Sequence, residues 1–406
     1  MGTERHDPAA ARSGSAGRLH PSCRYRPAMS PTEAQARALI GEPRSRWRLP
    51  TPALILDLDR LEANIRQLGK LTAGHPVQLR PHAKSHKSSL IAAAQIAAGA
   101  VGICCAKLGE AEALAAAGIG DILVTSPIAS DDVAWRAAAL AHDCRALAVV
   151  VDHEIGLTAL IAAAEAQGVA IDVLIDVDVG LGRTGVSSAA AALALARVIA
   201  QSPMLRLRGV QGYGGHWQHL RGADARLDAV RAGMDRLTDI VFALRLAGHP
   251  CPVISGGGTG TLAADLAIGV LTELQPGSYI FMDAQYTDAL AADSVFSTSL
   301  FVQAQVVSVN APAWVTVDAG LKAFAADGPM PRAVGPLFGD TSYLFFGDEH
   351  GMVSRPQGDF STRPGERIEF VTPHCDPTVD RYDFFHIVRG DTLVAIEPID
   401  AARRSQ

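Results

Sequence analysis

The stretch Ile171-Asp172-Val173-Leu174-Ile175-Asp176-Val177 decides the fold class, because it begins a strand–helix–strand unit that the chain repeats. An alanine-rich helical segment at 187–201 follows it and stops before Pro203, and another apolar run occupies 206–212. Apolar runs joined by amphipathic helices are typical of parallel strands that are buried on both faces. This unit therefore predicts an α/β protein.

The same alternation extends in both directions from this unit. Strand-like runs lie at 77–80, 101–105, 121–125, 146–151, 171–177, 206–212, 252–255 and 271–275. Helical patterns lie between them, among them 110–117 and 223–247. Eight parallel strands with intervening helices predict a closed (β/α)8 TIM barrel.

A second, β-rich domain is expected beside the barrel. The run 53–57 would be a ninth barrel strand, so it is assigned to the second domain, and after about residue 295 β-type runs replace the helices. Such runs lie at 300–302, 305–307, 314–317, 367–371 and 392–396. The predicted division is a disordered N-terminal arm at 1–35, a β domain from 36–58 and 290–406, and a barrel at 59–289.

Composition limits the function classes. The 406 residues have a net charge of −6 and no sustained basic stripe, which argues against nucleic acid as a partner and favours a small-molecule substrate. The six cysteines form no CxxC pair, which fits a reducing cytoplasm. No apolar run is long enough to indicate a membrane span. The first 30 or so residues lack a secretory apolar core, so they are interpreted as a disordered tail before a start near Met29, with a transit-like arm as the alternative.

Polar residues that follow the predicted strands should meet at one rim of the barrel, where such folds carry their active sites. Lys84 follows the first strand, Arg183 the fifth and His219 the sixth. Two glycine-containing loops follow the seventh and eighth strands, and they comprise Gly256-Gly257-Gly258-Thr259-Gly260 and Gly277-Ser278-Tyr279. Bare backbone N–H groups in such loops could bind a phosphate, although a plain turn is the alternative.

Lys84 is the candidate covalent residue. Most lysines after strands are solvated surface groups, but Arg80, His82 and His86 are expected to give Lys84 a cationic, partly dry setting that lowers its pKa. An amine that forms imines beside a phosphate loop indicates pyridoxal phosphate.

The segment Gly180-Leu181-Gly182-Arg183-Thr184-Gly185 matches the GxGxxG fingerprint of dinucleotide-binding proteins. No carboxylate lies about twenty residues further on, where the sequence at 200–208 contains none. An NAD enzyme is therefore the weaker interpretation.

A metal site is predicted at His374 and Asp376, which would point to the same side of a strand with Cys375 on the other side. Imidazole and carboxylate favour Mn²⁺ or Mg²⁺, with Zn²⁺ as an alternative, and an ordinary polar surface pair is the simpler explanation. In Tyr213-Gly214-Gly215-His216-Trp217-Gln218-His219, His219 is preferred over His216 as the acid–base residue.

Together these segments resemble the D-threonine aldolase and D-serine dehydratase branch of the alanine racemase-like (fold-type III) pyridoxal-phosphate enzymes. The resemblance covers residues 51 to about 400. The resemblance rests on Arg80-Pro81-His82-Ala83-Lys84, on the segments 177–185, 256–260, 273–279 and 318–322, and on His374-Cys375-Asp376-Pro377-Thr378.

The resemblance implies that Lys84 holds the cofactor covalently, that Arg183 lies beside its pyridine ring, and that the glycine loops bind its phosphate. His82 and Tyr213 are further expected cofactor contacts, and His374 and Asp376 would bind the metal. It also implies a homodimer. Asp380 departs from the branch, in which asparagine is usual, and this puts the hydrogen bonding near the metal in doubt.

The leading function is a metal-dependent aldolase that cleaves D-β-hydroxy-α-amino acids to glycine and an aldehyde. The resemblance implies this function because aldolases of the branch have a His-x-Asp metal motif, as this chain does, whereas dehydratases have His-x-Cys. His219 would remove the hydroxyl proton. The alternatives are a D-serine or D-threo-3-hydroxyaspartate dehydratase, a non-catalytic cofactor-binding protein and, less favoured, a racemase. The preferred side chain at the β-carbon and the exact metal are not legible in the sequence.

Overall fold

A computed structural model describes residues 29–335, 338–355 and 361–406, and one of its two sheets is a parallel barrel. The strand order is β2-β9-β8-β7-β6-β5-β4-β3. The strands are β2 (Gln78–Leu79), β3 (Ile103–Cys105), β4 (Asp121–Val124), β5 (Ala146–Val151), β6 (Ile171–Asp176), β7 (Leu205–Gly212), β8 (Val253–Gly256) and β9 (Glu273–Leu274). The ends of this sheet meet, because the Cys104 N–H donates to the Pro81 carbonyl at 2.9 Å and His82 forms a parallel bridge with Cys104. The predicted barrel is confirmed.

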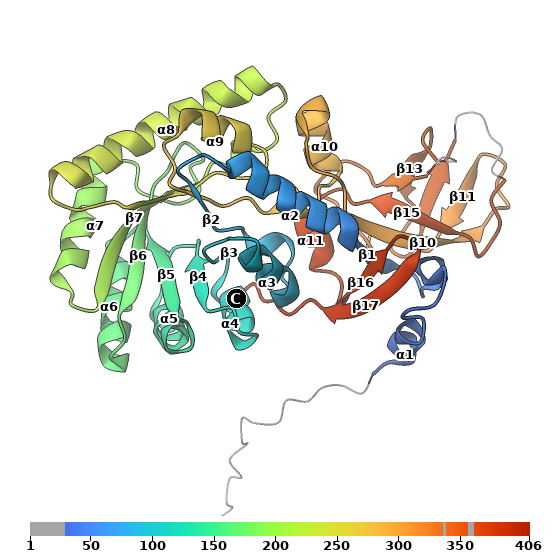
Figure 1. Ribbon diagram of the computed structural model, residues 1–406, viewed down its shortest axis with the longest axis horizontal. Helices are drawn as coiled ribbons and strands as arrows, with labels where there is room; N and C mark the ends of the chain where they lie inside the picture. The colour runs from blue at the N-terminus through green and yellow to red at the C-terminus, as the bar shows by residue number, and fades with distance from the viewer. Residues whose placement is uncertain (1–28, 336–337, 356–360) are drawn as a thin grey trace, which may run out of the picture.

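Helices cover the outside of this barrel (Figure 1). They are α2 (Leu58–Thr72), α3 (Ser89–Ala97), α4 (Leu108–Ala116), α5 (Asp131–Asp143), α6 (Glu154–Gln167), α7 (Ala189–Gln201), α8 (Ala223–Leu246) and α9 (Leu262–Ile268), with α10 (Ala284–Leu290) at the end of the barrel segment. In α2 the residues Leu61, Ile65 and Leu68 are buried, as a helical spacing of four and three requires for one apolar face.

The second domain is a largely antiparallel sheet with the path β13-β14-β11-β10-β1-β16-β17, to which β15 and β12 are added beside β10. Its strands are β1 (Ala53–Asp57), β10 (Leu300–Ser308), β11 (Trp314–Val317), β12 (Arg332–Val334), β13 (Ser342–Phe345), β14 (Gly351–Ser354), β15 (Arg367–Val371), β16 (Phe384–Arg389) and β17 (Thr392–Pro398). All five residues of β1 are buried, because β1 lies between β10 and β16. The prediction that the N-terminal strand joins this domain is confirmed.

Two expectations for this domain are wrong. The runs 300–302 and 305–307 form the single strand β10, because one long strand pairs with β1 at its start and with β11 at its end. The residues His374 and Asp376 do not lie in a strand. The chain leaves β15 at Val371, and His374 is the N-cap of the short helix α11 (Cys375–Val379).

The N-terminal arm lies mostly outside the described residues. Its predicted last residues are not disordered, since Pro31–Arg37 forms α1, with the Ser30 hydroxyl capping its start and Ala36 buried. The short 3-10 turns are η1 (Ser45–Arg48), η2 (Ala83–Ser85), η3 (Gly215–Trp217), η4 (Ser278–Ile280) and η5 (Ala291–Asp293).

Helix α11 lies between the two domains (Figure 1). The Ala284 N–H donates to the Thr372 carbonyl at 3.0 Å, and the Cys375 N–H donates to the Asp283 carboxylate at 2.8 Å. These bonds hold the start of α11 against the barrel. Within the described residues, no helix combines the length and apolar character needed to cross a bilayer.

Candidate active site

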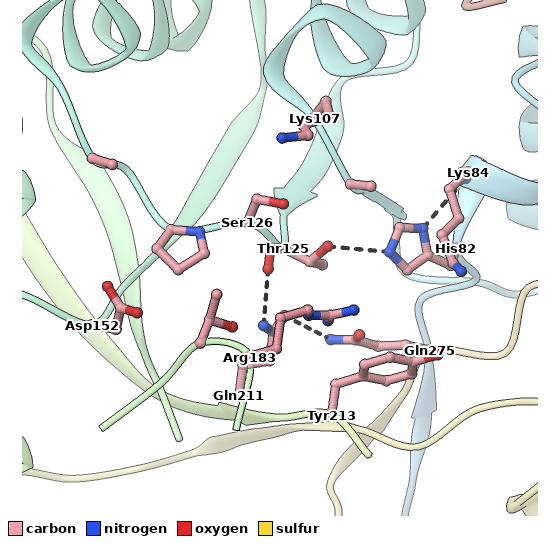
Figure 2. Close-up of a pocket in the computed structure, with 14 residues that line it drawn as sticks. His82, Lys84, Lys107, Thr125, Ser126, Asp152, Arg183, Gln211, Tyr213 and Gln275 are labelled. Carbon is pink, nitrogen blue, oxygen red and sulfur yellow. Dashed lines mark hydrogen bonds between the residues drawn. The ribbon is translucent and has the colours of Figure 1, made fainter. Parts of the chain in front are cut away.

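A cavity of about 550 Å³ opens at the rim of the barrel where the parallel strands end (Figure 2). Residues from seven barrel strands or the loops after them line it, and they are His82, Lys84, Ala106, Lys107, Thr125, Ser126, Pro127, Ala129, Asp152, Arg183, Thr184, Gln211, Tyr213 and Gln275. This volume lies in the range of small-molecule sites. Four predicted residues, Lys84, His82, Arg183 and Tyr213, therefore share one cavity.

Lys84 lies in η2, directly after the first barrel strand, and its ammonium is 3.0 Å from the Asp376 carboxylate. Asp376 raises the pKa of Lys84. The expected lowering of this pKa is thus wrong, and the neighbours explain why. Arg80 is neutralised by Glu273 at 2.9 Å and Asp121 at 2.6 Å, so the nearest charge to Lys84 is a carboxylate from the other domain.

His82 and His86 add no positive charge, because burial lowers the pKa of both imidazoles, that of His86 to about 3. The His82 Nδ1 accepts the Lys84 backbone N–H at 3.3 Å, and its Nε2 is 3.1 Å from the Thr125 hydroxyl. These two contacts hold the imidazole in place in the wall of the cavity.

The floor of the cavity is a chain of amide hydrogen bonds. Gln275 donates to Gln211 at 3.3 Å and to Ser255 at 2.8 Å. Gln211 donates in turn to Asp176 at 2.9 Å. Burial raises the pKa of Asp176 to about 6. Such a connected network makes the floor rigid.

Arg183 and Tyr213 form one wall, with the guanidinium carbon 5.4 Å from the centre of the phenol ring. Figure 2 shows both side chains beneath His82 and Lys84. Stacking on the ring restrains a cation that is otherwise exposed.

His219 lies near the metal-ligand candidates rather than in the lining of this cavity. Its Nε2 is buried and has no hydrogen-bond partner, and its ring packs on Tyr286 with centroids 4.5 Å apart. Burial first, and then the charges of His374 and Lys84, lower the pKa of His219 to about 4. The imidazole is therefore neutral at pH 7 and has a free nitrogen.

His374 and Asp376 project from the first turn of α11. The His374 Nδ1 is 2.9 Å from the Asp327 carboxylate, and Asp376 is 3.4 Å from the Ser278 hydroxyl. Burial opposes ionisation of Asp376, but Lys84 and His374 hold its pKa well below the usual range. In the part of the chain that the structure describes, no group of three or more His, Cys, Asp or Glu side chains is arranged around a metal position.

The second glycine loop lies against the turn that carries Lys84, and both glycine loops lie outside the cavity lining. The Tyr279 N–H donates to the Thr259 hydroxyl at 3.0 Å, which joins the loops, and Gly277 lies against the His82 carbonyl. The phenol of Tyr279 is buried and accepts a hydrogen bond from Gln95 at 3.0 Å, so its hydroxyl group already has a partner within the protein.

The glycines of the first loop also have a packing role. The Gly258 N–H donates to the Thr261 hydroxyl at 3.1 Å, and the Gly260 N–H donates to the Gln218 side chain at 2.9 Å. A Cβ on Gly260 would lie 2.0 Å from the Gln218 carbonyl. Only glycine fits at this position, where the first glycine loop closely approaches the segment after β7 that contains Gln218.

Sequence reasoning missed several cavity residues, including Lys107, Thr125, Asp152 and Gln275. Each lies at or just after the end of a barrel strand. Lys107 and Asp152 follow the second and fourth predicted strands, whose loops contain no motif that marks them, and Thr125 and Gln275 are the last residues of the third and eighth predicted strands.

The residues fit pyridoxal phosphate. A half-buried lysine on the cavity wall suits covalent attachment, an arginine in the same cavity suits the ring, and the glycine loop at Gly277 borders the lysine turn. The His374 and Asp376 pair, beside the unpartnered His219 nitrogen, suits a divalent ion that keeps open positions.

Comparison with known proteins identifies both halves of the chain. The family described as "Alanine racemase, N-terminal domain" matches residues 56–285, and the family described as "Putative serine dehydratase domain" matches residues 299–388.

Individual relatives match most of the chain. A D-threonine aldolase of Arthrobacter sp is 39% identical over 357 residues, which cover 87% of this chain and 93% of that protein. A 3-hydroxy-D-aspartate aldolase of Paracoccus denitrificans is 35% identical over 360 residues, which cover 87% and 92%. The crystal structure of the D-threonine aldolase from Filomicrobium marinum superimposes with a TM-score of 0.84 at 38% identity, and the match covers 87% of this chain and 95% of that one.

Proposed function

Because the chain belongs to the alanine racemase-like family, and is a pyridoxal-phosphate-dependent lyase of its D-threonine aldolase and D-serine dehydratase branch, we propose that it cleaves D-β-hydroxy-α-amino acids. The products would be glycine and an aldehyde, and the reaction would need a divalent metal. Membership of a lyase branch removes the non-catalytic alternative.

The observation that carries the proposal is the contact between Lys84 and Asp376. A lysine on the barrel rim and a carboxylate on α11 lie 3.0 Å apart although they come from different domains. Asp376 and His374 would hold the metal next to the position at which a substrate amine meets Lys84. The ion, manganese by preference and magnesium or zinc as alternatives, would act as a Lewis acid on the substrate hydroxyl group.

The chain's own residues supply the remaining steps. The neutral His219 Nε2, which is buried and unpartnered, takes the proton of the β-hydroxyl group as the Cα–Cβ bond breaks. Bound pyridoxal phosphate supplies an electron sink for the charge left on Cα. Lys84 then returns a proton to Cα and glycine leaves.

Cofactor binding is assigned to the cavity and to the adjoining loops. Lys84 would attach the cofactor, His82, Arg183 and Tyr213 would contact its ring, and a group of backbone and hydroxyl donors would bind its phosphate. That group comprises Gly256, Gly257, Gly258, Thr259, Gly277, Ser278 and Tyr279. We also propose a homodimer in the cytoplasm, which the resemblance to the branch and the cysteine pattern support.

The test is to incubate the purified protein with D-threonine and D-serine, with and without Mn²⁺, and to identify the products. Glycine with acetaldehyde from D-threonine, lost on chelation and restored by Mn²⁺, is expected. The Lys84→Ala variant should lose the visible absorbance of the bound cofactor, and His219→Gln should keep the absorbance but cleave at least about 100-fold more slowly.

Dehydration is the second candidate, because residues 299–388 match the family described as "Putative serine dehydratase domain". It would convert D-serine or a 3-hydroxyaspartate into a keto acid and ammonia. Ammonia without glycine would establish dehydration and refute the aldolase assignment.

A further inference from the structure

Lys107 is a charged residue of the cavity that the chemistry described above does not use. It lies directly after β3 at the start of α4, and Figure 2 shows its side chain at the edge of the cavity beyond Ser126. Within the described residues, its ammonium forms no ion pair or hydrogen bond. Lysine at an N-cap does not stabilise a helix, because the orphan N–H groups there need acceptors and the helix dipole disfavours a cation.

The backbone of Lys107 is nevertheless held firmly. The Glu110 carboxylate accepts the N–H groups of Ala106 at 2.8 Å and of Lys107 at 3.3 Å. Glu110 is buried and forms an ion pair with the buried Lys87, three residues after Lys84. One buried ion pair therefore fixes the relative position of the loops that carry Lys84 and Lys107.

The charges on the cavity wall leave Lys107 available to a ligand. Lys84 is paired with Asp376 at 3.0 Å, and Arg183 lies against Tyr213. Asp152, the carboxylate in the lining, accepts the Gly185 N–H at 3.0 Å and forms no ion pair with Lys107. His82 is uncharged, since burial lowers its pKa. An anionic group that enters the cavity would find an ammonium with no competing partner.

We propose that Lys107 binds the α-carboxylate of the substrate and so restricts this enzyme to free D-amino acids, as opposed to their amides or esters. The inference rests on the proposed function, because the substrate must meet Lys84 with its amino group. A carboxylate on the same carbon is then held within the cavity that Lys84 and Lys107 share. A charge-assisted hydrogen bond to this carboxylate would orient Cα as well as add affinity.

The test compares D-threonine with D-threoninamide, which lacks the negative charge. Lys107→Met should lower kcat/KM for D-threonine by about 10- to 100-fold, the range for hydrogen bonds to charged groups, and should leave the value for the amide nearly unchanged. Lys107→Arg should recover part of the loss. Lys70→Met, on the exposed surface of α2, is the matched control and should leave kcat/KM unchanged for both substrates.

Cofactor absorbance provides a readout that does not depend on cleavage. D-alanine has no β-hydroxyl group, so its binding and that of D-alaninamide can be titrated even if the protein cleaves no substrate. Weaker binding of D-alanine alone in Lys107→Met would support the inference even where the aldolase assignment fails. Equal losses for acid and amide, loss of the cofactor itself, or unchanged binding of both would each overturn it.

Discussion

Replacing Asp265 by asparagine should stabilise the protein at neutral pH. Asp265 lies in α9, beneath the loop that contains Gly257, and is fully buried. One carboxylate oxygen accepts the Thr261 hydroxyl proton at 2.7 Å, and the other has no partner. Burial raises the pKa of this carboxyl group from 3.8 to about 7. The folded protein thus keeps a proton that the unfolded chain releases.

The sign and size of the effect follow from this difference. The contribution of the Asp265 proton to the free energy of unfolding is fully present below the unfolded pKa of 3.8. It falls as the pH rises and is lost once the pH passes the folded pKa of about 7. A difference of about three pKa units at about 1.36 kcal/mol each corresponds to about 4 kcal/mol. Asparagine has a similar shape and does not titrate, so the variant should show none of this loss.

The assay is urea unfolding of both proteins at pH 4, 5.5 and 7.5, at equal concentration and equal cofactor loading. At pH 4 the free energies of unfolding should differ by less than about 1 kcal/mol, since both side chains are neutral in the folded proteins and the unfolded aspartic acid is only partly ionised. At pH 7.5 Asp265→Asn should be more stable by about 2 to 4 kcal/mol. A difference between the two proteins that does not change with pH would refute the reasoning, because it would mean that the pKa of Asp265 is the same in the folded and the unfolded protein.

Two further changes test the proposed metal ligand His374 and the packing of the first glycine loop. Asp327→Asn should weaken Mn²⁺ binding about 10- to 100-fold in a calorimetric titration. The reason is that the carboxylate 2.9 Å from the His374 Nδ1 would no longer orient the imidazole ring. Unchanged affinity would show that this contact is incidental. Gly260→Ala should destabilise the protein by about 1 to 3 kcal/mol in urea unfolding, because its Cβ would lie 2.0 Å from the Gln218 carbonyl. Gly69→Ala in α2, where nothing lies within 4 Å of the new Cβ, is the control and should stabilise the protein by up to about 1 kcal/mol. If Gly69→Ala lost as much stability as Gly260→Ala, the clash with Gln218 would not be the cause.

The barrel and its rim were predictable because they depend on local patterns. Each strand is a short apolar run and most of the helices between them are alanine-rich, so periodicity located all eight barrel strands to within a few residues. Once the strands are placed, the topology brings Lys84, Arg183 and Tyr213 to one cavity whatever the details of packing.

The electrostatics of the site was not predictable in this way. Near Lys84 in the sequence lie Arg80, His82 and His86, which suggested a lowered lysine pKa. In space, Arg80 faces the acids of the barrel interior, the imidazoles are neutral, and Asp376 is the charge that meets Lys84. A contact between residues 292 positions apart in the chain depends on how the domains dock, which no local pattern records.

One buried carboxylate shows how that docking places the proposed metal ligands. Asp283 accepts the Tyr286 N–H at 2.8 Å through one oxygen, which caps α10, and the Cys375 N–H at 2.8 Å through the other, which holds the first turn of α11. Since His374 and Asp376 flank Cys375, any shift of α11 would move both together relative to Lys84. The barrel would supply the proposed cofactor residues and the β domain the proposed metal ligands, so the proposed chemistry depends on the junction between the domains rather than on either domain alone.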